Sequence, residues 1–100
     1  MMKIPKEFKI ANSTIYVELL DIVLNEDKHE IFGNFNSATN TIKVARTIDG
    51  IKLNDEQILN TFLHELFHAF QFFFDNTYSE AEAQCYSNFM REFESSAVYN

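Results

Sequence analysis

The chain has 100 residues, of which 46% are hydrophobic and 15% aromatic, so it holds enough apolar material for one compact core and is too short for two. We therefore expect a single domain over residues 1–100, and the scarcity of glycine and proline excludes a disordered segment. The formal charge of −7 would repel a phosphate backbone, which disfavours direct nucleic-acid binding.

The sequence also predicts a cytoplasmic protein that does not enter a membrane. Residues 1–10 mix charged and apolar side chains and contain no apolar run of the kind found in a signal peptide. No stretch reaches the roughly 18 to 20 apolar residues of a membrane span. Cys85 is the single cysteine, so it cannot form an internal disulfide, which fits a reducing compartment.

The first half of the chain predicts β-strands. Apolar and polar residues alternate in short β-prone runs that are separated by turn-forming residues, with a turn at Asn12-Ser13 and another over residues 37–40. Residues 20–24 fit a short helix equally well. The predicted strands cover residues 8–10, 14–20, 31–36 and 41–46. Together they indicate a small antiparallel sheet of three or four strands.

The second half predicts two helices, which makes the fold class α+β. Asn54 and Gln57 have the spacing of an N-terminal capping box, and the first helix is expected to end near Asp75-Asn76. Its apolar residues recur on one face: Ile58, Leu59, Phe62, Leu66, Ala69, Phe70 and Phe73. Ser79 and Glu82 form a second capping-box pattern, and the final helix then has an apolar stripe at Tyr86, Phe89, Met90 and Phe93.

The middle of the first predicted helix carries the segment His64-Glu65-Leu66-Phe67-His68. A separation of four residues places both imidazoles on one face of a helix, about one turn apart, where two nitrogens can bind one zinc ion. Glu65 projects beside the pair, where its carboxylate can act as the general base for a metal-activated water. The simpler interpretation, two histidines flanking a core helix, requires a chance coincidence in a chain with only three histidines.

A catalytic zinc needs a third protein ligand, and the acidic residues that follow are Asp75, Glu80, Glu82, Glu92 and Glu94. Glu82 shares the inward stripe of the last helix with Tyr86 and is our preferred ligand. Glu80 aligns with the polar face and is the reserve. Glu82 has a structural alternative, which is to complete the capping box of Ser79.

Three other kinds of residue are interpreted as structural. Cys85 is expected to be a small core residue, and His29 a surface residue in a polar loop. Tyr78 and Tyr86 are near enough in sequence to stabilise an oxyanion, but packing is the more frequent role of aromatic residues at such positions. None of them enters the predicted site.

The order of a short sheet, an HExxH helix and a helix with Glu82 fourteen residues after His68 resembles the minimal zincin peptidases, specifically the small SprT-like and ImmA/IrrE-like proteins of bacteria and phages. The opening residues 3–8 and the segment 60–68 also look like short phage-type metallopeptidases. The resemblance implies that His64, His68 and Glu82 bind zinc and that Glu65 is the general base. It further implies an edge strand that binds substrate as an added β-strand, for which residues 41–46 are the candidate.

The sequence therefore predicts a zinc-dependent peptidase of the gluzincin-like type, a hydrolase whose substrate is a peptide or protein. The alternative is a non-catalytic zinc-binding domain that contacts a protein partner. A third interpretation is a structural domain without metal. Eleven phenylalanines also leave a homodimer open. The chain has neither the Cys-rich zinc ribbon nor the helix-turn-helix that often accompany these families, so no particular substrate is inferred.

Overall fold

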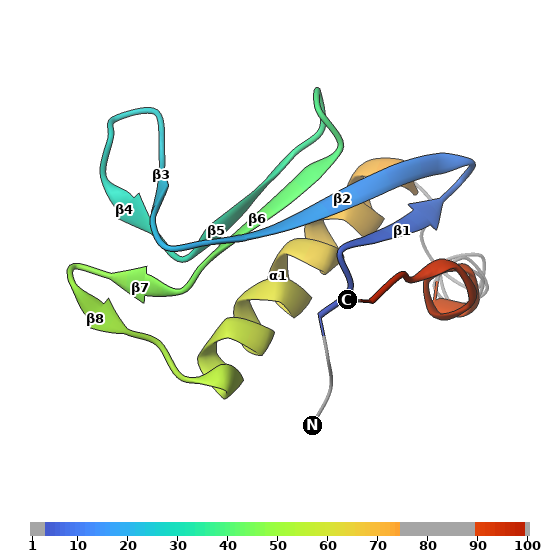
Figure 1. Cartoon of the computed structure of the whole chain (residues 1–100). Helices are drawn as coiled ribbons and strands as arrows, with labels where there is room; N and C mark the ends of the chain where they lie inside the picture. Colours follow the sequence, from blue (N-terminus) through green and yellow to red (C-terminus); the bar gives the residue numbers. More distant parts are fainter. Residues whose placement is uncertain (1–3, 75–89, 100) are drawn as a thin grey trace.

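The computed structural model describes residues 4–74 and 90–99. These residues form a mixed α+β fold, as predicted (Figure 1). The elements in chain order are β1 (Glu7–Ile10), β2 (Ser13–Leu20), β3 (Val23–Leu24), β4 (Glu30–Ile31), β5 (Gly33–Asn36), β6 (Thr41–Ala45), β7 (Thr47–Ile48), β8 (Ile51–Lys52) and α1 (Asp55–Phe73), followed by helical residues 90–96. The second capping-box pattern, Ser79 with Glu82, and the start of the last predicted helix lie outside the described residues.

Four of the strands form one sheet, in the order β1-β2-β6-β5. The β1–β2 and β5–β6 pairs are antiparallel, but β2 and β6 are parallel, so the prediction of a wholly antiparallel sheet is wrong. The chain leaves β2, passes through β3, β4 and β5, and turns back into β6, which then runs in the same direction as β2. The register pairs Val17 with Ile42 and Leu19 with Val44, so apolar side chains of both strands share one face.

Local turns explain where the strands begin and end. Ala11 and Asn12 both have positive φ, at 49° and 68°, which is the geometry of a two-residue hairpin turn that follows the twist of the strands. The turn therefore comes one residue earlier than predicted. Residues 20–24 contain strand β3 and no helix. β3 pairs with β4, and β7 pairs with β8, in two small hairpins at one end of the sheet (Figure 1).

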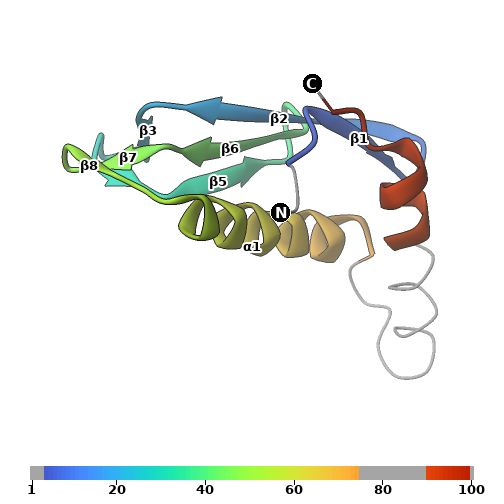
Figure 2. The same ribbon diagram turned by 60° about the horizontal axis from the view of Figure 1, so that its bottom comes forward.

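Helix α1 packs under one face of the four-stranded sheet (Figure 2). The predicted capping box is confirmed: Asn54 Oδ1 accepts a hydrogen bond from the Gln57 amide at 2.8 Å, and Gln57 Oε1 accepts one from the Asn54 amide at 2.9 Å. The helix ends at Phe73, two residues before the predicted end. Its predicted apolar face is confirmed as well, because all seven residues of that face belong to the core cluster or pack against it.

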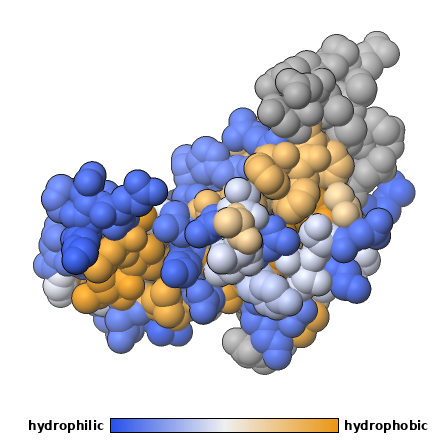
Figure 3. Space-filling view, turned by 90° about the horizontal axis from the view of Figure 1, so that it is seen from above, coloured by the Kyte–Doolittle hydropathy of each residue, from blue (hydrophilic) through white to orange (hydrophobic). Residues whose placement is uncertain are grey.

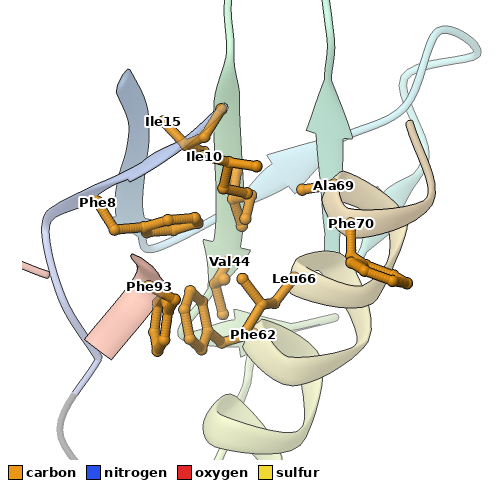
Figure 4. Packing of buried hydrophobic residues seen from close by; sticks show 10 residues of the cluster. Phe8, Ile10, Ile15, Val44, Phe62, Leu66, Ala69, Phe70 and Phe93 are labelled. Atoms are coloured by element: carbon orange, nitrogen blue, oxygen red, sulfur yellow. The ribbon is translucent and has the colours of Figure 1, made fainter. Parts of the chain in front are cut away.

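The core lies between α1, the sheet and the C-terminal helical residues (Figure 4). Phe8 from β1 stands edge-on to Phe93, with ring centroids 4.8 Å apart, and also to Phe62 of α1 at 6.5 Å. Met90 packs against the same cluster. The apolar stripe predicted for the last helix is therefore confirmed at its two described positions, Met90 and Phe93.

The two edges of the sheet differ. β1 is covered by the C-terminal segment, since Lys6 N–H donates to the Val98 carbonyl at 2.7 Å and Val98 N–H donates to the Glu7 carbonyl at 2.8 Å. Strand β5 has β6 on one side, and nothing in residues 4–74 or 90–99 pairs with its other side. The prediction that residues 41–46 form an edge strand is wrong, because β6 lies between β2 and β5.

Candidate metal centre

Helix α1 brings the two predicted zinc ligands together. The Nε2 atoms of His64 and His68 are 3.0 Å apart, and the two rings stand nearly perpendicular, at 82°. Both side chains are exposed. Nδ1 of His68 lies 3.2 Å from Oε1 of Gln71, which accepts a hydrogen bond when Nδ1 carries the proton and thereby leaves the Nε2 lone pair for a metal.

The spacing of these nitrogens fits a zinc ion. Two nitrogens bound to one tetrahedral zinc at about 2.0 to 2.1 Å lie about 3.3 Å apart. The observed 3.0 Å differs from that separation by only a few tenths of an ångström, so a small opening of the pair would bring the two nitrogens to the distance that zinc requires. Neutral imidazole is a preferred zinc ligand, and the donor chemistry agrees with the geometry.

Glu65 lies on the side of α1 that faces the sheet. Its side chain is only 8% exposed, and it is the one buried charged residue of the described parts of the chain. Burial raises the pKa of the Glu65 carboxyl, while the neighbouring His68 and His64 oppose that rise. A divalent cation held by the histidines would stand beside this carboxylate and offset the cost of burying its charge. The buried acid is thus a second feature that suits a cation site.

A cleft of about 380 Å³ opens next to His64 and Glu65, between α1 and the start of β5. Its lining consists of Phe32, Gly33, Asn60, Thr61, His64 and Glu65. The sequence analysis identified the last two and missed the other four. One signal was present: Gly33 is one of only two glycines and sits in a β-prone run, where glycine often marks a close approach.

The structure has a close approach of this kind at Gly33. A Cβ atom on this residue would lie 2.6 Å from the Lys43 carbonyl oxygen and 2.7 Å from Cγ2 of Thr61. A side chain at position 33 would therefore push β5 away from β6 and from α1. The glycine keeps the cleft free of a side chain from this strand.

The structure does not test the third ligand, because Glu82 and Glu80 lie outside the described residues, as do Asp75, Cys85, Tyr78 and Tyr86. Within residues 4–74 and 90–99, no three His, Cys, Asp or Glu side chains gather as a metal site. Glu92 is engaged elsewhere, since its Oε1 accepts a hydrogen bond from Ala11 N–H at 2.7 Å. His29 is exposed in the loop between β3 and β4, as predicted.

No known protein family matches this chain, and neither the curated proteins nor the solved structures contain a match. The resemblance to the zincins therefore depends on the HExxH segment and its surroundings. Among the helices that the structure describes, none has the length and apolar character needed to cross a membrane.

Proposed function

We propose that this protein is a zinc-dependent peptidase. The observation that supports the proposal best is the convergence of the His64 and His68 Nε2 atoms, 3.0 Å apart, on the exposed side of a helix whose buried Glu65 lies between them in sequence. A cleft beside His64 gives a peptide access to the same place. Together with a third ligand, the histidine pair, the acid and the cleft are what hydrolysis by a metallopeptidase requires.

In this proposal His64 and His68 hold the zinc through Nε2, and Glu82 is the third ligand, with Glu80 as the reserve. Bound zinc would supply a water of lowered pKa, near 7, and would polarise the peptide carbonyl. Glu65 accepts a proton from the water while the water oxygen bonds to the carbonyl carbon of the peptide. The same carboxyl then gives that proton to the amine nitrogen as the C–N bond breaks, so protons balance and Glu65 is regenerated.

Strand β5 is the corrected candidate for the strand that positions the substrate. Ala45 N–H donates to the Phe32 carbonyl, and Gly33 lies opposite Val44, so residues 32, 34 and 36 bond to β6. The backbone groups of Gly33 and Phe35 therefore point to the open side. An extended peptide can pair with these groups and pass along the cleft next to His64.

The competing function is a zinc-binding module without catalysis that contacts a protein partner. Its specific support is the half-exposed Phe67, which lies in the motif directly before His68 and adds an apolar surface beside the histidines. In that case the same residues bind zinc, but Glu65 has no chemical role.

The decisive experiment measures zinc content and cleavage in the same preparation of the full chain. We expect about one zinc per chain and cleavage of an unfolded test protein. Glu65→Gln keeps the size of the side chain and removes the base, so it should retain zinc and lower the cleavage rate about 10²- to 10⁴-fold. His64→Ala, as the ligand control, should lose both zinc and cleavage.

The outcomes separate the candidate functions. Zinc without cleavage by the native protein favours the binding module. Absence of zinc after growth in zinc-supplemented medium, with folding intact by circular dichroism, contradicts both zinc functions and leaves the structural domain.

A further inference from the structure

The cleft beside the histidines has an aromatic residue at its mouth. Phe32 stands directly before β5 and is 48% exposed, although it lies against the cleft. Its carbonyl accepts a hydrogen bond from Ala45 N–H at 2.8 Å, which anchors its backbone to the central strand β6. The backbone of Phe32 is therefore held in place, and about half of the residue remains available for contact. Seen from above in Figure 3, apolar side chains gather towards the end of the molecule that carries β3, β4, β7 and β8.

Part of the wall of the cleft between α1 and β5, at Thr61 and Gly33, is apolar as well. The Thr61 hydroxyl donates to the Gln57 carbonyl at 3.1 Å, so its proton is used inside the helix. The methyl group of Thr61 is left facing Gly33, which has no side chain. A ligand that enters the cleft meets a methyl group and a glycine backbone there.

The charges around the cleft select against acidic ligands. Among the described residues that line it, none is Lys or Arg, and one is Glu65. An acidic side chain in this cleft would be repelled by the Glu65 carboxylate and would find no cation from the lining residues except a metal at the histidines. A large aliphatic or aromatic side chain would instead bury apolar surface against Phe32 and Thr61. The volume of about 380 Å³ accommodates a side chain of that size.

We propose that this cleft is the specificity subsite of the enzyme, that it accepts a large apolar side chain of a substrate residue next to the cleaved bond, and that Phe32 determines this preference. The inference rests on the proposed peptidase function and adds the class of substrate. Phe32 would act by contact with the substrate side chain, apart from the Glu65 chemistry.

The test is a set of unstructured peptides that differ at a single residue, with Phe, Leu, Ala, Lys or Asp at that position. Cleavage sites and rates are read by mass spectrometry. We expect the native protein to favour Phe and Leu over Asp, and Phe32→Ala to lower kcat/KM for the Phe and Leu peptides about tenfold relative to the Ala peptide. Phe32→Leu should keep most of the preference. Phe32→Lys should move it towards the Asp peptide, which a merely structural role would not produce.

Tyr16→Ala is the matched control. Tyr16 is 50% exposed, and it alternates with the inward-facing Ile15 and Val17 on β2, so it lies on the sheet face away from α1. Its replacement should leave the preference unchanged. Zinc content should be equal in all four variants, because none of them removes a ligand.

Each outcome decides the proposal. Cleavage without side-chain preference, or with a preference that Phe32→Ala leaves intact, overturns the subsite and leaves the peptidase function standing. If the native protein cleaves nothing, the peptidase proposal fails, and binding of the same peptides is measured by fluorescence anisotropy. Tighter binding of the Phe peptide that is lost in Phe32→Ala then supports the subsite, and equal binding of the Phe and Asp peptides overturns it.

Discussion

One edge of the four-stranded sheet is covered by other parts of the chain, and the other edge is open among the described residues. The edge at β1 is closed by residues that are distant in sequence: Ser96 Oγ accepts from Lys9 N–H at 2.7 Å, and Glu92 Oε1 accepts from Ala11 N–H at the same distance. The edge at β5 is open among the described residues and borders the cleft beside His64. Changes at the closed edge should therefore alter stability, whereas changes at the open edge should alter the recognition of ligands.

The largest effect at the closed edge is expected for Phe93→Ala. Phe93 is 7% exposed and packs against Phe8 of β1 and Phe62 of α1, so its removal leaves a cavity where sheet, helix and C-terminal segment meet. The free energy of unfolding should fall by about 3 to 5 kcal/mol. Urea denaturation followed by far-UV circular dichroism measures this change.

Phe67→Ala is the matched control for that substitution, since Phe67 is on α1 but half exposed. It should lower the free energy of unfolding by clearly less. Equal losses for the two variants would contradict the position of Phe93 in the core.

An effect of intermediate size is expected at the open edge, where the peptide ligand is changed instead of the protein. If a peptide pairs with β5, its backbone amides alternate between facing Gly33 or Phe35 and facing away. N-methylation of one amide at a time should weaken binding about three- to tenfold at every second position, because each lost hydrogen bond contributes roughly 0.5 to 1.5 kcal/mol. Competition against cleavage of an unmodified peptide measures this series. A uniform response along the peptide would exclude strand pairing.

The smallest effect is expected for Ser96→Ala at the closed edge. Ser96 Oγ accepts from Lys9 N–H and donates to the Glu92 carbonyl at 2.6 Å, and the exposed amide of Lys9 can bond water when the hydroxyl is removed. A loss of about 0.5 to 1 kcal/mol in the free energy of unfolding is expected. Ser95→Ala is the control, because the Ser95 hydroxyl bonds within its own turn and does not reach β1. If Ser95→Ala lowers the free energy of unfolding as much as Ser96→Ala does, the contact of Ser96 with β1 does not contribute to stability.

The features that the sequence predicted well are those that depend on near neighbours in the chain. The capping box of Asn54 and Gln57 needs residues three positions apart, and the core face of α1 follows from helical spacing alone. The His64–His68 pair is of the same kind, since one turn of helix fixes its geometry. Strand positions were also largely predicted, because turn residues separate the β-prone runs.

The order of the strands in the sheet could not be predicted from local sequence patterns. The residues of β6 alternate like those of an edge strand, with Lys43 between Ile42 and Val44, and only the pairing of β2 with β6 reveals that the strand is central. Alternation reports which face is buried and does not report how many neighbours a strand has. The error displaced the expected substrate strand from β5 to β6.

The cleft was missed for a similar reason. Phe32 and Thr61 are 29 positions apart in the chain, and neither belongs to the HExxH motif; they line one cleft because Gly33 allows β5 to approach α1 closely. The sequence shows Gly33, but it does not show that Thr61 lies next to this residue in the fold. The third ligand, Glu82 or Glu80, stays a prediction from helical phase.

The hydrogen bond between Lys9 and Ser96 joins residues separated by 87 positions in the chain. We expect such a contact to form late, because the entropy of closing a long loop is lost before any pairing energy is gained. Until then the outer side of β1 presents unpaired amides and carbonyls, which can template association with a second unfolded molecule. Refolding yield should therefore fall steeply with protein concentration. Aggregation through this edge should stop once residues 96–98 have bound to β1.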